Sequence, residues 1–187
     1  CIILFIIILL YIKTDFIKKH PIFEKCYLIN LNNTNVGKKR WELFKKHNIY
    51  YPYTTRFNGI YGKTYNYENE IKKNIIVTEW DYGKWKFNYM SKIIPLTKGE
   101  IGVSLSHYYV WKTIVDNNIN IALIQEDDSI CDKNTDKYLS NLMNYLPDNW
   151  DIFLLDFWNH TGDNDLKINN YIWKVKDFAL MNCYLIN

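Results

Sequence analysis

Residues 96–130 constrain the fold more than any other stretch, because a helix start, a long helix, a turn, a strand and three acids follow one another there. Thr97 and Glu100 have the spacing of a capping box, in which two side chains satisfy free backbone N–H groups of the first helical turn. Asn117 and Asn118 indicate the helix end, since Asn tolerates the left-handed backbone. Apolar residues spaced three and four apart predict an amphipathic stripe. Its members are Ile101, Leu105, Tyr108, Trp111 and Val115.

A short apolar run comes next and predicts a strand covered on both faces, as in a parallel sheet. Its members are Ile119, Ile121, Ala122, Leu123 and Ile124. Glu126, Asp127 and Asp128 stand at the end of this strand. The carboxyl ends of parallel strands face the crevice in which α/β proteins bind ligands. Three adjacent acids without nearby His or Cys favour a hard cation such as Mg²⁺ or Mn²⁺. The alternative is a solvated acidic turn, because acids are mostly exposed.

The matched positions of this stretch occur in a fixed order that resembles the central signature of glycosyltransferase family 25. They are Leu96, Thr97, Gly99, Glu100, Ile101, Gly102, Leu105, Ser106, His107, Trp111 and Glu126–Asp128. The chain departs from the pattern at Gln125, usually aliphatic in the family, and at Val103, often a cysteine. The family includes lipooligosaccharide and collagen galactosyltransferases. The resemblance implies a GT-A-like fold and an inverting transfer from a UDP-sugar, most often galactose, to a hydroxyl of a glycan or glycoprotein.

The composition suits one globular domain. A chain of 187 residues, 48% of them hydrophobic, can bury one sizeable core. The net charge of +3 is too small to indicate a nucleic-acid partner. The 4 Cys are scattered and predict neither a disulfide framework nor a zinc site.

The first residues predict a membrane connection. Residues 1–12 are continuously apolar, whereas a full span takes about 20 residues. Because the chain begins with Cys rather than Met, we expect the sequence to be incomplete at its front, with residues 1–12 left from a signal-anchor or signal peptide. This would make the protein membrane-associated or a member of the secretory pathway. The alternative is a buried strand or helix. Residues 13–24 predict a polar linker, and residues 25–187 a partial catalytic domain.

The start of the domain predicts a nucleotide-binding element. Residues 26–31 indicate a strand, residues 32–37 a turn, and Trp41 and Phe44 the apolar face of a helix. Basic residues at the mouth of such a unit can hold a diphosphate, and Arg40 is the best candidate because guanidinium binds phosphate bidentately. A solvated helix face is the alternative. The stretch resembles the family's opening, which assigns Asn30 and Leu31 with Arg40 to the UDP-sugar site.

Residues 53–95 give weaker signals. A strand over residues 53–57 is closed by a turn at Asn58 and Gly59. The stretch RFNGIYGK, residues 56–63, resembles a family element that has an acid at the position of Tyr61. Residues 63–95 predict an irregular excursion with one short helix. Its aromatic residues can line a sugar site or cover the domain flank. They are Trp80, Tyr82, Trp85 and Tyr89.

The last third predicts a helix over residues 138–146 stopped by Pro147, then strands over residues 150–155, 171–175 and 178–187. Asp156 follows the first of these strands and is the candidate for the catalytic base. A loop next to the proposed metal carries further titratable groups. They are His160, Asp163 and Asp165. Family members continue beyond this last strand, so we expect the acceptor side of the site to lie beyond Asn187.

Alternation of strands and helices predicts an α/β fold with a mostly parallel central sheet flanked by helices. Within the implied chemistry, Asp128 is the first choice for a Mn²⁺ or Mg²⁺ ligand, Glu126 contacts the metal or the ribose, and Asp127 is structural. His107 is either a buried, hydrogen-bonded histidine or has a family-specific role. Two alternatives are a non-catalytic nucleotide-sugar or glycan-binding module and a membrane-tethered structural domain.

Overall fold

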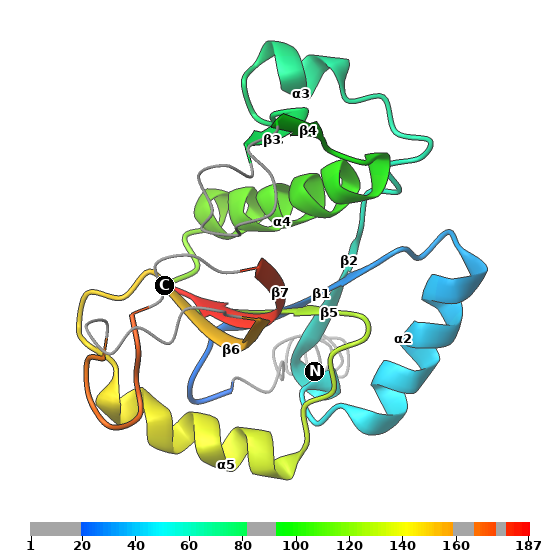
Figure 1. The fold of residues 1–187 in the computed structure, drawn as a ribbon. Coiled ribbons are helices and arrows are strands. Elements are labelled where there is room, and N and C mark those ends of the chain that lie inside the picture. The colour runs from blue at the N-terminus through cyan, green and yellow to red at the C-terminus, as the bar shows by residue number, and fades with distance from the viewer. Residues whose placement is uncertain (1–19, 82–92, 159–166, 175–178) are drawn as a thin grey trace, which may run out of the picture.

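The computed structural model describes residues 20–81, 93–158, 167–174 and 179–187 (Figure 1). The apolar segment 1–12 lies outside these residues, as do several aromatic and titratable residues singled out above. They are Tyr82, Trp85, Tyr89, His160, Asp163 and Asp165.

A five-stranded sheet in the order β2-β1-β5-β7-β6 forms the centre of the molecule. Its strands are β1 (Lys25–Asn30), β2 (Thr54–Asn58), β5 (Ala122–Glu126), β6 (Ile152–Trp158) and β7 (Ala179–Ile186). β1 pairs in parallel with both β2 and β5, whereas β7 runs antiparallel between β5 and β6. Four of the five strands therefore point the same way, which confirms the predicted α/β class with a mostly parallel sheet.

Helices cover both faces of this sheet. Figure 1 shows α4 (Lys98–Asp116) on one side, with α2 (Asn35–His47) and α5 (Lys133–Leu142) on the other. The predicted irregular excursion contains one short helix, α3 (Glu68–Lys72), and also an unpredicted antiparallel pair, β3 (Glu79–Asp81) and β4 (Ile93–Pro95). The remaining elements are the short 3₁₀ turns η1 (Tyr51–Tyr53) and η3 (Met143–Tyr145).

Alternation along the strands separates two apolar layers. Tyr27, Ile124 and Tyr184 pack with Val110 and Ile114 of α4 on one face. The neighbouring residues in each strand point the other way and pack with Leu139 of α5; they are Cys26, Leu123 and Leu185. Because consecutive side chains of a strand alternate between faces, this split follows directly from the strand assignments. The central strand β5 is buried on both faces, as predicted.

Gln125, the departure from the family's aliphatic strand, is fully buried in β5. Its Oε1 accepts a hydrogen bond of 2.7 Å from Nδ2 of Asn48, and its Nε2 donates to Sγ of Cys26 at 3.2 Å. A buried amide is tolerated when its polar atoms have partners. The substitution therefore stays compatible with the strand.

The start and the end of α4 confirm the prediction. Oγ1 of Thr97 accepts from the backbone N–H of Glu100 at 3.2 Å, and Oε2 of Glu100 accepts from the N–H of Thr97 at 2.7 Å. Asn118 adopts a left-handed backbone with φ of 51° at the exit. The predicted stripe is wrong at Val115, which is 73% exposed, because Ile114 takes the position facing the sheet.

Replacing Thr97 with alanine should lower the free energy of unfolding by about 1 kcal/mol, because the first turn of α4 loses its cap. Ser104→Ala is the matched control, since Ser104 is exposed in the same helix. Urea unfolding of both variants measures the difference. An unchanged Thr97→Ala variant would show that the helix does not depend on this capping box.

Two predictions in the last third are wrong. Residues 171–174 form no strand, and the structure records only an isolated bridge between Trp173 and Lys167. The helix predicted over residues 138–146 begins earlier, at Lys133, because Asp132 caps it by accepting from the N–H groups of the next turn. Tyr138, expected on its apolar face, is 65% exposed, and the helix tightens into η3 before Pro147.

Residues 20–24 pack against the domain, although the sequence assigned them to a polar linker. His20 and Phe23 are buried, and Nε2 of His20 lies 3.0 Å from Oδ1 of Asp136 in α5. The backbone N–H of Glu24 donates to the carbonyl of Ile121 at 2.8 Å. Across the described ranges, none of the helices has both the length and the apolar character that crossing a bilayer requires.

Candidate functional site

The carboxyl ends of β1, β2 and β5 meet at one edge of the sheet. Asn30 ends β1 opposite Asn58 of β2, and Ile29 is aligned with Glu126, the last residue of β5. Parallel pairing makes this convergence unavoidable, because strands that run the same way present their ends at the same edge. The predicted residues at the ends of β1 and β5 therefore lie on one side of the molecule.

Asn30 connects the β1–α2 turn to the acidic residues. Its side chain is only 1% exposed, and its Nδ2 donates to the carbonyl of Gly37 at 2.8 Å and to Oδ2 of Asp127 at 2.5 Å. Its Oδ1 accepts two hydrogen bonds from the guanidinium of Arg56, one of them from Nε at 2.9 Å. A buried amide with every polar atom engaged fixes its neighbours in one arrangement.

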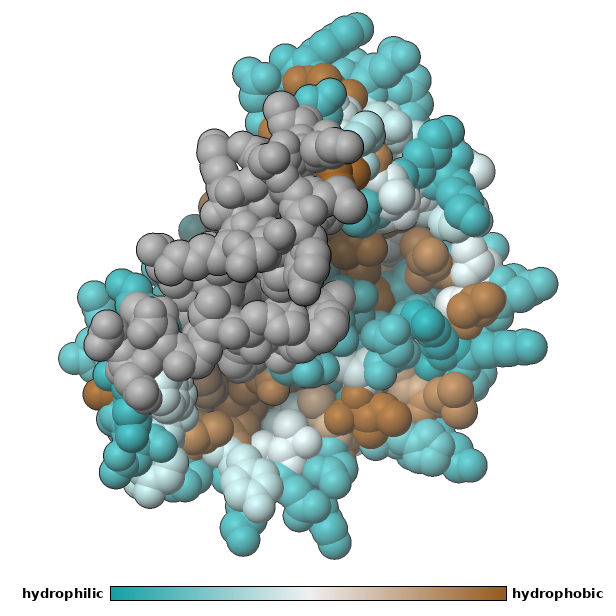
Figure 2. All heavy atoms as spheres, viewed as in Figure 1, coloured by the Kyte–Doolittle hydropathy of each residue, from teal (hydrophilic) through white to brown (hydrophobic). Residues whose placement is uncertain are grey.

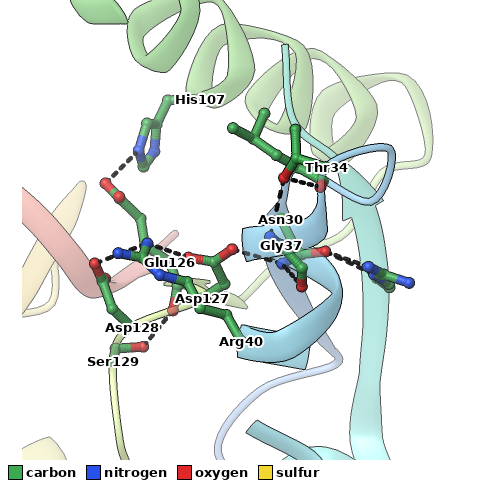
Figure 3. A network of polar contacts seen from close by, with 11 residues as sticks. Asn30, Thr34, Gly37, Arg40, His107, Glu126, Asp127, Asp128 and Ser129 are labelled. Carbon is green, nitrogen blue, oxygen red and sulfur yellow. Dashed lines mark hydrogen bonds and ion pairs between the residues drawn. The ribbon is translucent and has the colours of Figure 1, made fainter. Parts of the chain in front are cut away.

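The three acids at the end of β5, Glu126, Asp127 and Asp128, have different surroundings (Figure 3). Asp127 is 10% exposed, and its Oδ1 accepts a hydrogen bond of 2.8 Å from Nη1 of Arg40. Its Oδ2 accepts the hydrogen bond from Asn30. Asp128 is 49% exposed, and its Oδ2 lies 3.2 Å from the same guanidinium nitrogen. The hydrogen bond with Asp127 raises the pKa of Arg40. The carboxylate of Asp127 is thus fixed by Asn30 and Arg40, whereas that of Asp128 is half-exposed to solvent.

Glu126 faces α4, where His107 approaches it. Nε2 of His107 lies 3.2 Å from Oε1 of Glu126, and Nδ1 lies 2.8 Å from the hydroxyl of Tyr184. His107 is buried in the third turn of α4 and is hydrogen-bonded on both ring nitrogens. This position agrees with the expectation of a buried, hydrogen-bonded histidine.

A pocket of about 280 Å³ opens at this edge between the β1–α2 turn, the loop after β2 and the first half of α4. Its lining includes all four residues predicted to contact a UDP-sugar: Asn30, Leu31, Arg40 and Glu126. Asp127 and His107 also line it, whereas Asp128 and Asp156 do not. Figure 2 shows apolar atoms among polar ones on the surface between α4 and α2.

Asp156, the candidate base, lies within β6, which continues to Trp158, rather than after a strand ending at Leu155. It pairs with Cys183 of β7, which in turn pairs with Gln125 of β5. Asp156 is exposed, and Nδ2 of Asn182 approaches it at 3.5 Å. It therefore lies near the same edge of the sheet, with β7 between it and β5, and outside the pocket.

The carboxylates at the end of β5 can supply only part of a divalent-cation site. The described part of the chain contains no group of three or more His, Cys, Asp or Glu side chains arranged to hold a metal ion. Mg²⁺ in nucleotide sites uses one or two carboxylates together with substrate phosphates, so a complete protein cage is not required. Asp128 fits this role because its carboxylate is half-exposed and lies two residues after Glu126.

Sequence reasoning gave no role to Lys63, which contributes a second cation to the pocket from the loop after β2. It also missed the packing of Gly62 and Gly102 behind that loop. A Cβ on Gly62 would lie 1.7 Å from the carbonyl oxygen of Lys98, and one on Gly102 would lie 2.7 Å from the backbone N of Gly62. The glycines within IYGK and KGEIG were the sequence signal that could have indicated this close approach of two backbone segments.

Comparison with known proteins agrees with the motif. The model of glycosyltransferase family 25 (LPS biosynthesis protein) matches residues 23–182. Procollagen galactosyltransferase 1-A of Xenopus laevis is 32% identical over 108 residues, 57% of this chain and 16% of that protein. Human procollagen galactosyltransferase 2 is 44% identical over 63 residues, 34% of this chain and 9% of that protein. The chain thus spans a small part of these relatives. Because the family model covers most of its length, the chain belongs to glycosyltransferase family 25.

Proposed function

We propose that this chain is a glycosyltransferase that moves a hexose, galactose by analogy with the named relatives, from a UDP-sugar to a hydroxyl of a glycan or glycoprotein acceptor. The observation that carries this proposal is the pocket at the carboxyl edge of the sheet. It brings Asn30, Leu31, Arg40 and Glu126 together in a chain of family 25. Inversion at the sugar carbon and dependence on a divalent cation are part of the proposal.

The charges of the pocket suit a diphosphate. Arg40 lines it from α2 and Lys63 from the loop after β2, so two cations can face the phosphates. Arg40 is held in place by Asp127, and its side chain is still 44% exposed. An anchored but accessible guanidinium can therefore bind phosphate without first losing conformational freedom.

Asp128, together with Glu126, would hold a Mn²⁺ or Mg²⁺ ion beside the diphosphate. The ion supplies Lewis-acid stabilisation of the charge that develops on the departing UDP. The chain's own contribution is to position these carboxylates at the end of β5, while Asn30 and Arg40 together occupy both oxygens of Asp127.

Asp156 is proposed as the base that takes the proton of the acceptor hydroxyl while the new glycosidic bond forms and the bond to UDP breaks. Its exposure and its position near the same edge of the sheet support this role. Since it lies outside the pocket, the acceptor would occupy the surface between Asp156 and the donor. Asp156→Asn should then abolish most transfer while leaving UDP binding intact.

The direct test is calorimetric titration of the chain with UDP in the presence of Mn²⁺. Asp128→Asn should remove most of the Mn²⁺-dependent affinity and leave the fold intact, because it deletes one ligand charge at an exposed site. Asp148→Asn removes the same charge from an exposed position outside the pocket and should bind like the unmodified chain. Unchanged affinity in Asp128→Asn would contradict the metal assignment.

A transfer assay separates an enzyme from a binding module. The assay combines radiolabelled UDP-galactose, Mn²⁺ and a panel of collagen-peptide and lactosyl acceptors, and labelled glycan would establish transfer. Binding of UDP-galactose without turnover on any acceptor would favour a nucleotide-sugar-binding role for this chain.

A further inference from the structure

A chain of buried and part-buried hydrogen bonds behind the pocket ends on Glu126. Nε1 of Trp111 donates to the hydroxyl of Tyr184 at 2.7 Å, and that hydroxyl lies 2.8 Å from Nδ1 of His107. Nε2 of His107 then lies 3.2 Å from Oε1 of Glu126. Of these four residues, the proposed function gives a role only to Glu126, and none to His107, Tyr184 or Trp111.

The direction of these hydrogen bonds follows from the donors available. The indole N–H of Trp111 can only donate, so the oxygen of Tyr184 accepts from it. Burial raises the pKa of Tyr184, which therefore keeps its proton and donates it to Nδ1 of His107. The proton of a neutral imidazole then resides on Nε2 and points to the carboxylate of Glu126. The opposite tautomer would place a lone pair against that carboxylate and leave the Tyr184 proton without its acceptor.

We propose that His107 is a positioning residue for the ligand in the pocket: its Nε2–H holds Oε1 of Glu126 and leaves Oε2 to receive a hydroxyl or the cation of a bound nucleotide sugar. In the described residues, no side chain or backbone group makes a hydrogen bond to Oε2 of Glu126. This inference rests on the proposed function, because it assumes that the pocket binds a nucleotide sugar.

The hydrogen bond limits the freedom of Glu126. A carboxylate on a flexible stem loses rotamer entropy when it binds a ligand, and a fixed donor on one oxygen removes part of that loss beforehand. Partners that orient a liganding side chain typically change affinity about tenfold to hundredfold when they are removed. Trp111 and Tyr184 act one step earlier, since they set the tautomer of His107.

Two amide substitutions of His107 separate its two contacts. His107→Gln can place an amide N–H where Nε2 lies and keep the contact with Glu126. His107→Asn is shorter, so it can reach Tyr184 but not Glu126. We expect His107→Asn to weaken binding of UDP-galactose with Mn²⁺ about tenfold to hundredfold. His107→Gln should retain most of the affinity.

The decisive measurement is a double-mutant cycle with Glu126→Gln, read as the dissociation constant of UDP-galactose by calorimetry. If His107 acts through Glu126, His107→Asn causes no further loss in the Glu126→Gln background. Additive losses, or equal losses in the Asn and Gln variants that follow their unfolding midpoints, would overturn the inference and leave the proposed function standing. Absence of binding by the unmodified chain would instead overturn the proposed function together with this inference.

Discussion

Replacing Asn30 with leucine is expected to destabilise the domain by about 3 kcal/mol, because three buried or half-buried groups lose their partner at once. The carbonyl of Gly37, a carboxylate oxygen of Asp127 and the guanidinium of Arg56 all bond to this amide. Leucine has the same branching at Cγ and is the larger residue, so the loss reports unsatisfied polar groups and crowding rather than a cavity.

Asn58→Leu provides the control for that experiment. Asn58 is the partner of Asn30 across the β1–β2 ladder, and its side chain is exposed. A surface substitution of this kind changes stability by about 0.5 kcal/mol or less. Urea unfolding of the two variants should differ accordingly, and equal free energies would show that Asn30 does not hold this edge of the sheet together.

Gly102→Ala is expected to lower the free energy of unfolding by about 1–3 kcal/mol, as overpacked substitutions do, and to weaken UDP binding. The added Cβ would meet the backbone N of Gly62 and the carbonyl oxygen of Ile60, both at 2.7 Å. Backbone atoms cannot rotate away as a side chain can, so the loop carrying Tyr61 and Lys63 must shift. These two residues line the pocket, which links the steric conflict to ligand binding.

Gly99→Ala makes the same chemical change three residues earlier in α4. The nearest atom to its Cβ would be Oγ1 of Thr97 at 3.7 Å, an ordinary contact. This substitution should be neutral or stabilising by up to about 1 kcal/mol, since alanine restricts the unfolded chain. Thermal unfolding should therefore separate the two variants. Similar behaviour would mean that α4 and the loop are not in close contact.

Residues 96–130 were predictable because their signals are local. The capping box of Thr97 and Glu100 involves residues three apart, and the left-handed exit at Asn118 is a property of one residue. The apolar run that ends at Ile124 indicated a strand covered on both faces, and β5 is buried and occupies the centre of the sheet. Local patterns of this kind survive folding when tertiary packing favours the same conformation.

The remaining features depend on contacts between distant segments. His107 and Tyr184 are 77 residues apart, so no periodicity could indicate their hydrogen bond. The same holds for Arg40 and Asp127, which are 87 residues apart. The sequence identified Arg40 as a phosphate ligand from its chemistry, but the carboxylate that anchors it became visible only in three dimensions.

The errors at Val115 and Tyr138 have a common cause. Both residues are apolar and fall near the expected stripe of a helix, yet both are exposed. Side-chain type indicates which residues can be buried, whereas the neighbouring strands decide which of them are. Packing of Ile114 against Tyr27 and Ala122 rotates the contact face of α4 away from Val115.

The antiparallel strand β7 has a consequence for the order of assembly during synthesis. β6 pairs with β7 and with none of the earlier strands, so it cannot join the sheet until β7 has left the ribosome. Until then β5 and β6 both present open edges, which are the surfaces most prone to pair with another chain. Completion of this sheet is therefore a late event in which the newest strand enters between two older ones. A translational pause before residue 179 would prolong the interval in which a chaperone has to cover these edges.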